Sequence, residues 1–375
     1  MSNVFHNSDN QSQPATPLDK CETVEEIDGD ELVMILSRYD IGAIQRIKSY
    51  KKGSRQAPKL IVGSTKGKYL LKRRAVGRDA IDRVNFSHIV QKKLGEHRFP
   101  VAGLVETIHG NTLVEHDGRI YELFHFINGH RFDKSKPESA ESGRVLAHCH
   151  DILRKFSEEP EVKKTSFHQI ETTKKTISEV VDVLSNYENK SNLEGMDETA
   201  CYIGEQFDKA KFTAESVGFS SLPTSVVHGD WHPGNMLYED GEIVAVIDFD
   251  SLRIAQRITD IANGVLQFSM RMGTDDVNNW PNSFRGHTIR SMVQGYNAFT
   301  VLPLLPSELS IIPPLMKEAL IVESVFHVHR TGSFGNILGS DFLRMVERKL
   351  RWIDDKAERI IEVLQPPRSG GDSFE

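Results

Sequence analysis

Two stretches of the chain, HGDWHPGN at residues 228–235 and VAVIDFD at residues 244–250, decide its fold. Asp230 and Asn235 lie five positions apart, and Asp248 follows thirteen residues later at the end of an apolar strand. A carboxylate can orient a hydroxyl group, and amide and carboxylate oxygens are hard ligands of the kind that Mg²⁺ prefers. The spacing therefore predicts a phosphoryl-transfer site.

The same spacing occurs in the pattern H-x-D-x-x-x-x-N followed by D-F-G of protein kinases. Asp230 is the predicted catalytic residue, which accepts a hydrogen bond from the acceptor hydroxyl and aims it at the γ-phosphorus. Asn235 and Asp248 are the predicted Mg²⁺ ligands. A polar loop after a strand is the structural alternative, but three oxygen-bearing groups at set distances favour the site.

Four further residues are expected to support this loop. We expect His228 to brace it by hydrogen bonding rather than act as a general base, and His232 either to lie near a phosphate or to be structural. Asp250 lies two positions beyond Asp248 on the same face of an extended segment, where it could reach a metal-bound water or a loop amide. Asp260 begins a helix and is expected to cap or brace the loop.

The nucleotide-binding groups are expected in the N-terminal part of the chain. Gly53 and Ser54 lie between two strand-like segments, where backbone amides could approach a phosphate, although this stretch has one glycine rather than a G-x-G-x-x-G set. Lys72 ends an apolar strand, the position of the kinase lysine that holds the α- and β-phosphates. A solvated lysine in a basic cluster is the alternative.

Adenine is expected at a hinge near residues 121–129, where Glu122 and Phe124 would offer backbone groups, although the segment also reads as a core strand. The partner of Lys72 is harder to assign, because the helical pattern at residues 78–97 contains no glutamate before Glu96. Asp82 is the predicted partner, with a surface charge as the alternative.

Composition narrows the class of protein. A formal net charge of −7 argues against a nucleic-acid or anionic-membrane partner. Three cysteines without disulfide or metal spacing indicate reduced thiols. The sequence shows no secretory signal and no apolar run long enough to span a bilayer, so we expect a cytoplasmic protein.

The chain divides into two lobes between polar tails. Residues 1–27 and 365–375 are expected to be disordered, because their composition cannot bury enough apolar surface to offset ordering. Residues 28–127 predict an N-terminal ATP-binding lobe of strands with one main helix, at 78–97. Residues 128–364 predict a larger, mostly helical lobe with the catalytic stretch in a strand-loop-strand island. The predicted fold is α+β and two-lobed, as in protein kinases.

The motifs resemble those of the aminoglycoside phosphotransferase and choline kinase superfamily, and in pattern its homoserine-kinase-like branch. The resemblance covers about residues 30–363 and is strongest in the catalytic stretch. It rests on residues 228–235, 247–250 and Asp260, and on shorter matches at 39–42, 98–101, 126–129 and 146–150. It implies a kinase-like fold and transfer of phosphate from ATP, with Mg²⁺, to a small hydroxyl compound.

The predicted function is accordingly a small-molecule kinase whose acceptor is an amino alcohol or hydroxy amino acid, homoserine being favoured. One alternative is an antibiotic phosphotransferase of the aminoglycoside type. Another, suggested by the missing helix glutamate, is a weakly active or non-catalytic nucleotide-binding module.

Overall fold

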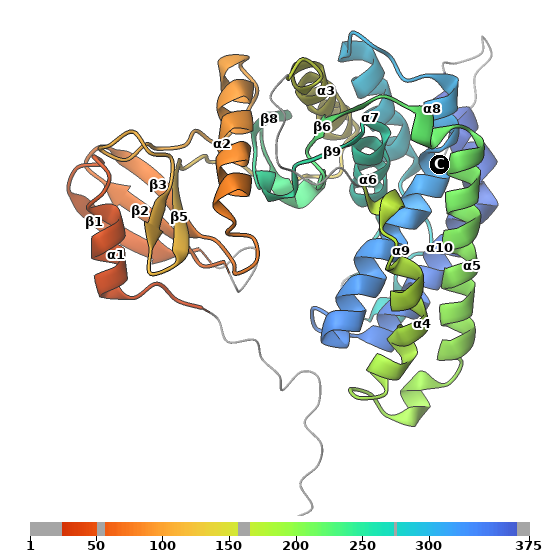
Figure 1. Ribbon diagram of the computed structural model, residues 1–375. Coiled ribbons are helices and arrows are strands. Elements are labelled where there is room, and N and C mark those ends of the chain that lie inside the picture. The colour runs from red at the N-terminus through yellow and green to blue at the C-terminus, as the bar shows by residue number, and fades with distance from the viewer. Residues whose placement is uncertain (1–24, 51–56, 157–165, 274–275, 366–375) are drawn as a thin grey trace, which may run out of the picture.

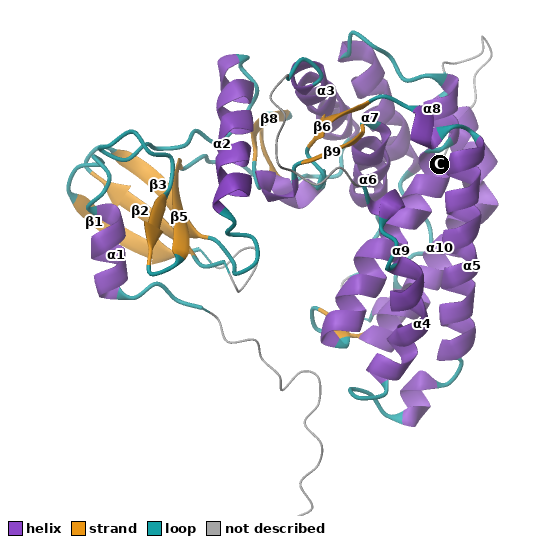
Figure 2. Ribbon diagram, in the orientation of Figure 1, coloured by secondary structure: helices purple, strands orange, loops and turns teal. Residues whose placement is uncertain are grey.

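A small sheet-containing lobe and a larger helical lobe are joined by the segment after strand β5 (Figure 1). The computed structural model describes residues 25–50, 57–156, 166–273 and 276–365. Strands dominate the first lobe, and helices surround a few short strands in the second (Figure 2). The predicted α+β two-lobed fold is confirmed.

The N-terminal lobe is built on one antiparallel sheet with strand order β1-β2-β3-β5-β4. Its strands are β1 (Ile44–Ser49), β2 (Lys59–Ser64), β3 (Gly67–Arg73), β4 (Val114–His116) and β5 (Arg119–His125). The expected hairpin around residues 64–67 is present, since Ser64 pairs with Gly67 across the β2–β3 turn. Residues 104–108, which read as a strand, form only an isolated bridge from Leu104 to Phe124.

Helix α1 (Gly29–Leu36) covers one face of this sheet. Asp28 caps it by accepting a hydrogen bond from the backbone of Glu31 at 2.8 Å, and the Glu31 side chain completes a capping box. The residues just before the helix also contact the lobe: Glu25 forms an ion pair with Arg73 at 2.9 Å, and Ile27 packs against the core. Residues 25–27 are therefore not part of a disordered tail, and residues 1–24 and 366–375 lie outside the described residues.

Helix α2 (Ile81–Glu96) belongs to the N-terminal lobe by sequence but packs into the core of the other lobe. Its buried Val90 and Leu94 share a hydrophobic cluster with Val145 and Leu146 of the helical lobe. Figure 1 shows α2 standing between the sheet and the helices. Groups on α2 are thereby placed beside the catalytic stretch.

The helical lobe contains the remaining elements. Its α-helices are α3 (Lys136–Leu153), α4 (Thr173–Leu184), α5 (Met196–Ser216), α6 (Ile258–Ser269), α7 (Gly286–Phe299), α8 (Pro306–Ser310), α9 (Ile312–Thr331) and α10 (Gly339–Leu364). Its paired strands are β6 (Thr224–Val227) with β9 (Arg253–Gln256), β7 (Met236–Glu239) with β8 (Glu242–Val246), and β10 (Ser333–Phe334) with β11 (Ile337–Leu338). The pattern at 306–331 predicts one helix, but the chain breaks it before Pro313 and Pro314, because proline is tolerated only in a helix's first turn.

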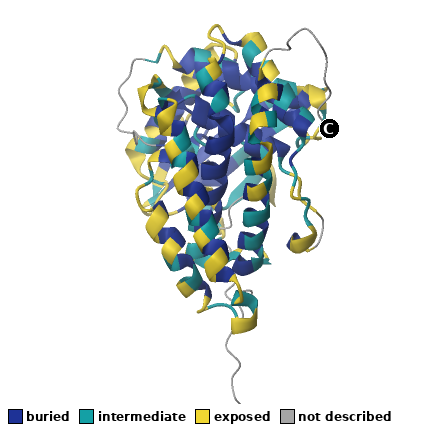
Figure 3. Cartoon of the chain, turned by 90° about the vertical axis from the view of Figure 1, so that its right-hand side faces the viewer, coloured by how far each residue is buried: buried dark blue, intermediate teal, exposed yellow. Residues whose placement is uncertain are grey.

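The main hydrophobic core lies inside the helical lobe. Figure 3 shows buried residues gathered in its interior and exposed residues along its outside. None of the helices within the described residues is long and apolar enough to cross a membrane.

Helices α3 and α7 approach each other through two glycines. A Cβ atom on Gly143 would lie 1.8 Å from the backbone oxygen of Met292, and one on Gly295 would lie 2.0 Å from that of Ala140. Both obstacles are backbone atoms, which cannot move aside as a flexible side chain could. The two positions therefore require glycine for steric reasons.

We predict that Gly143→Ala lowers the free energy of unfolding by about 2 kcal/mol or more, since overpacking outweighs the gain in helix propensity. Gly204→Ala in α5 is the matched control, because a Cβ atom there would lie 3.7 Å from Ile177 of α4, which is an ordinary van der Waals contact. The control should be neutral or stabilising by about 0.5 kcal/mol. Urea unfolding of both variants measures the difference, and equal stabilities would contradict the steric explanation.

Candidate active site

Residues 228–235 form the predicted catalytic loop. Asp260 holds the beginning of this loop. The backbone N–H groups of His228 and Gly229 each donate to its carboxylate at 2.8 Å, and His150 lies 3.2 Å from it on the other side. Burial opposes ionisation, but these contacts with His150 and the loop leave the pKa of Asp260 below its usual value. These contacts are what the predicted bracing role of Asp260 requires.

His228 is fully buried beside Asp260, which accepts a hydrogen bond from its backbone N–H. The backbone N–H of Asp230 donates to its Nδ1 at 3.3 Å, and burial lowers the pKa of the ring. The neutral ring packs against Trp231 and Phe249. The hydrogen bond from Asp230 is the kind of contact that the predicted bracing role of His228 requires.

Gly229 permits the catalytic loop to turn beside the backbone of residues 248–251. These residues follow β8 and contain the predicted Mg²⁺ ligand Asp248, so we call them the metal loop. Its φ is +77°, and a Cβ there would lie 2.2 Å from the backbone oxygen of Ser251. Both the left-handed conformation and the close approach therefore require glycine.

Asp230, His232 and Asn235 form one connected group. Asn235 donates from Nδ2 to the backbone oxygen of Asp230 at 3.0 Å and to its carboxylate at 3.2 Å. His232 accepts from the N–H of Gly234 at 2.9 Å, and its Nε2 lies 3.5 Å from the Asp230 carboxylate. Burial opposes ionisation, but His232 leaves the pKa of Asp230 below its ordinary value, so this carboxylate is charged at neutral pH. His232 is thus placed beside the predicted catalytic residue.

Asp248 turns the chain after β8. It adopts the left-handed conformation at φ +66°, which costs about 1–2 kcal/mol in a residue other than glycine. Burial works against its charge, but Lys72 and then Lys59 lower the pKa of Asp248 to about 2. An ionised carboxylate is therefore held beside a cavity that lies between the two lobes.

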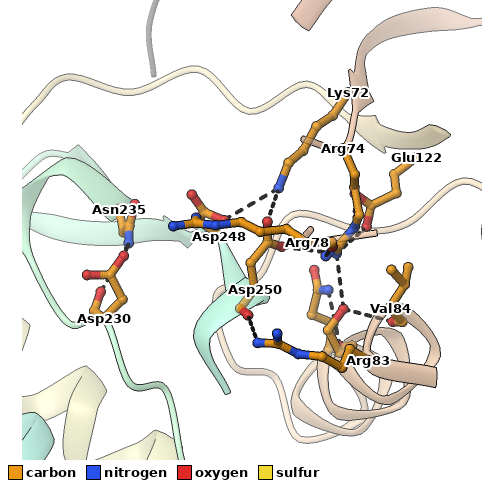
Figure 4. Close-up of polar contacts among 12 residues, drawn as sticks. Lys72, Arg74, Arg78, Arg83, Val84, Glu122, Asp230, Asn235, Asp248 and Asp250 are labelled. Carbon is orange, nitrogen blue, oxygen red and sulfur yellow. Dashed lines mark hydrogen bonds and ion pairs between the residues drawn. The ribbon is translucent and has the colours of Figure 1, made fainter. Parts of the chain in front are cut away.

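Lys72 and Arg74 both pair with Asp250 across the two lobes (Figure 4). Lys72 Nζ lies 2.9 Å from Asp250 and 3.4 Å from Asp248, and Arg74 lies 3.0 Å from Asp250. Arg83 on α2 donates to the backbone oxygen of Asp250 at 3.2 Å. Asp250, expected at a metal-bound water or a loop amide, is thus observed joining the lobes.

The predicted pairing of Lys72 with Asp82 is wrong. Asp82 is exposed in the first turn of α2, because its position on the helix faces away from the cleft, and both acidic partners of Lys72 come from the metal loop. The buried acid of the N-terminal lobe is Glu122, which pairs with Lys72 across β3 and β5 in the strand register.

The side chain of Glu122 is fully buried in an ionic network. It accepts two hydrogen bonds from Arg74, both at 2.8 Å, and lies 2.7 Å from His88 of α2. Burial raises the energy of its charge, but Arg74 and His88 hold the pKa of Glu122 well below its usual range. Helix α2 therefore contributes a histidine, His88, to this network, and the glutamate comes from β5.

Two cavities meet at the catalytic loop. One, of about 370 Å³, lies between the lobes and is lined by Lys72, Glu122 and Phe124, by the segment 126–131, and by Asn235 and Asp248. Another, of about 280 Å³, lies within reach of Asp230. The predicted metal ligands face the inter-lobe cavity, and the predicted catalytic residue faces the second one. Gly53 and Ser54 lie outside the described residues.

The residues at the inter-lobe cavity suit a divalent cation bound together with a nucleotide. Asn235 uses its amide nitrogen on Asp230, and its Oδ1 accepts no hydrogen bond from the described residues. Within the same residues no group of three or more His, Cys, Asp or Glu could hold a metal by itself. Mg²⁺ is typically held by one or two carboxylates and completed by substrate phosphates, which fits one Asp and one Asn.

Sequence reasoning missed several charged residues that line these cavities, among them Arg74, Lys59, Arg78, Arg253 and Glu323. Arg74 had a signal, since it lies two positions after Lys72 and so shares a face of β3. Lys59 lies across β2–β3 in register with Lys72. Arg253 and Glu323 had no signal, because each reaches the second cavity only through the tertiary fold.

We predict that Glu122→Gln lowers the free energy of unfolding by about 3 kcal/mol at pH 7, because Arg74 loses one of its two buried counter-charges. A depressed folded pKa stabilises the protein above the unfolded value near 4.5, and this stabilisation is lost as pH falls through the folded pKa. The difference from wild type should therefore shrink below pH 4.5. Urea unfolding at pH 7 and pH 4 tests this.

Glu106→Gln is the matched control for Glu122→Gln. Glu106 pairs with Lys92, both half exposed, and should contribute less than about 1 kcal/mol at either pH. Equal effects of the two variants at pH 7 would show that the buried network does not stabilise the fold.

Solved structures of low sequence identity share this fold. An aminoglycoside phosphotransferase from Alicyclobacillus acidocaldarius is 16% identical, and the match covers 91% of this chain and 99% of that one with a TM-score of 0.64. A microcompartment-associated aminopropanol kinase is 14% identical, covering 88% and 98% with a TM-score of 0.61. A choline kinase from Cryptosporidium parvum is 14% identical, covering 89% and 97% with a TM-score of 0.58.

Curated relatives match a shorter stretch. Stress response kinase A of Salmonella choleraesuis is 23% identical over 185 residues, which are 48% of this chain and 51% of the relative. A serine/threonine protein kinase, RdoA, of Salmonella typhimurium matches with the same figures. The chain thus spans about half the length of the curated relatives it matches.

The model of one family covers most of the chain. It matches residues 47–302, from the first strand of the N-terminal lobe to beyond α7, and is described as the phosphotransferase enzyme family. The match includes Lys72, Asp230, Asn235 and Asp248, which the fold brings to the two cavities. The chain therefore belongs to the phosphotransferase enzyme family.

Proposed function

We propose that this chain transfers the γ-phosphate of ATP, with Mg²⁺, to the hydroxyl group of a small polar metabolite. An amino alcohol or hydroxy amino acid, homoserine-like, is the proposed acceptor. The observation that carries the proposal is the division of the predicted residues between two neighbouring cavities: Asn235 and Asp248 face the inter-lobe cavity, and Asp230 faces the second cavity.

The inter-lobe cavity is the proposed ATP site. Lys72 would hold the α- and β-phosphates, and the segment 126–131 with Glu122 and Phe124 would surround the adenine end. Asn235 and Asp248 would hold Mg²⁺, which when bound neutralises charge on the phosphate oxygens. A solved amicoumacin kinase of this fold contains AMP-PNP and Ca²⁺, which supports nucleotide and divalent-cation use here.

Asp230 is proposed to orient the acceptor. Its charged carboxylate accepts a hydrogen bond from the hydroxyl, whose oxygen forms a bond to the γ-phosphorus while the bond to the β–γ bridging oxygen breaks. The hydroxyl proton passes to Asp230, and ADP leaves. Because the transition state is loose, positioning matters more than base strength, and the lowered pKa of Asp230 suits that role.

The second cavity supports a small acceptor. Its volume of about 280 Å³ suits a metabolite, and Phe167 and Ile170 form part of its wall.

Free cysteines at Cys149 and Cys201, together with the need for ATP, support a cytoplasmic location. Aminoglycosides and serine- or threonine-containing peptides are the rival acceptors. A screen of ADP release against amino alcohols, hydroxy amino acids, sugars, aminoglycosides and such peptides tests the proposal.

We predict that Asp230→Asn lowers kcat by about 10²- to 10⁴-fold while the affinity for ATP stays within a few-fold of wild type, because Asp230 faces the acceptor cavity. Asp240→Asn is the control, since Asp240 is exposed at a left-handed turn that Asn also tolerates. Steady-state ADP release and nucleotide titration measure both effects. Near-wild-type turnover of Asp230→Asn would remove this residue from the mechanism.

We also predict that Asp248→Asn raises the Mg²⁺ concentration for half-maximal turnover by about tenfold or more, since even outer-shell changes cost 10- to 100-fold in metal affinity. Asp240→Asn should leave the Mg²⁺ titration unchanged. An unaltered titration for Asp248→Asn would exclude it as a ligand.

A further inference from the structure

The second cavity contains charges of both signs. Acidic Asp230, Asp260 and Glu323 share it with basic Arg78 and Arg253. An amino alcohol offers a hydroxyl and an ammonium group but no anionic group for an arginine to bind. The two arginines therefore point to an acceptor with an anionic group.

Arg253 is fixed beside the catalytic loop with part of its guanidinium unused. Nε donates to the backbone oxygen of Ser251 at 3.1 Å, and Nη2 donates to that of Gly229 at 3.2 Å. Its Nη1 donates to none of the described residues. Two carbonyl groups orient the guanidinium without neutralising it, and a fixed guanidinium with free N–H groups matches a carboxylate.

Arg78 brings a second cation from the other lobe. It lies between β3 and α2, and its exposed side chain extends toward the metal loop (Figure 4). Its guanidinium has no hydrogen-bond or ion-pair partner in the described part of the chain, although it lines the second cavity with Arg253. The cavity thus contains an unpaired cation from each lobe.

Glu323 of α9 supplies the negative end of the cavity. Gln267 of α6 donates a hydrogen bond to its carboxylate and orients it. Solvent reaches this side chain, yet the protein around it and the charge of Asp230 raise the pKa of Glu323 to about 7. A bound ammonium would offset that crowding of negative charge.

We propose that the acceptor is a hydroxy amino acid rather than an amino alcohol, with its carboxylate bound by Arg253 and Arg78 and its ammonium facing Glu323. The inference rests on the proposed function, in which Asp230 receives the hydroxyl in this same cavity. It chooses between two acceptor classes that the sequence leaves open.

The test uses acceptors that differ by one group. L-homoserine is compared with 3-amino-1-propanol, which lacks the carboxylate, and with 4-hydroxybutanoate, which lacks the amine. L-serine, ethanolamine and 3-hydroxypropanoate form a second, shorter set. ADP release by the full chain with ATP and Mg²⁺ should give a kcat/KM for one of the amino acids that exceeds that of its decarboxylated analogue by about 100-fold or more.

Outcomes of this comparison separate the two proposals. Preference for the amino alcohols, or activity only on sugars or aminoglycosides, overturns the carboxylate inference and leaves the phosphotransferase proposal standing. No ADP release with any compound of the wider screen contradicts the proposed function itself, and the inference with it.

Variants locate the carboxylate contact. Arg253→Gln should raise KM for the amino acid so that its kcat/KM falls about 100-fold more than that of the decarboxylated analogue; Arg253→Lys should restore part of this difference. Equal losses with both acceptors would mean that Arg253 is structural, and would overturn the inference. Arg351→Gln is the control, because Arg351 is exposed on α10 and pairs with Glu347.

Arg78→Gln gives an independent reading, because this side chain holds no part of the fold together. A raised acceptor KM with kcat retained supports carboxylate binding. A fall in kcat alone, equal for the amino acid and its analogue, places Arg78 on the transferred phosphate and removes it from acceptor recognition.

Discussion

The carboxylate of Asp250 is the interaction on which the arrangement of the two lobes depends. It binds Lys72 at 2.9 Å and Arg74 at 3.0 Å, both from the sheet, and its backbone oxygen accepts from Arg83 of α2 at 3.2 Å. Buried charges are costly unless paired, so these cations specify the position of the metal loop against the sheet. The inter-lobe cavity exists because this junction holds its two walls together.

Charge balance extends from this junction into both lobes. Arg74 divides its guanidinium between Asp250 and Glu122, and His88 lies against the other side of Glu122. Since His88 is on α2, which packs into the helical core, the network reaches both lobes through buried contacts. In the helical lobe another buried carboxylate, that of Asp260, holds the start of the catalytic loop by accepting two backbone hydrogen bonds.

The catalytic loop contributes residues to both cavities within a few positions of the chain. Its first part faces the second cavity with Asp230, and its last part turns Asn235 toward the inter-lobe cavity. The bond from Asn235 to Asp230 links them, so a hydroxyl placed at one would be aligned with phosphates placed at the other. The basic and acidic groups around Asp230 then set which molecules can bring that hydroxyl.

The sequence by itself determined the local parts of this protein. The spacing of Asp230, Asn235 and Asp248 predicted a phosphoryl-transfer site, because one short loop and one strand end contain all three. Strand and helix patterns predicted both lobes, since side-chain periodicity depends only on neighbouring residues. Asp260 was predicted as a brace because it begins the helix that follows the metal loop.

Only the tertiary structure decided which charges meet. Lys72 was paired with Asp82 on sequence grounds, but α2 turns Asp82 to solvent and the metal loop supplies the partners instead. Glu122, Arg253 and Glu323 come from β5, β9 and α9, and their meeting depends on how those elements pack. Spacing along the chain places no limit on such distances, so the second cavity could be recognised only in the folded molecule.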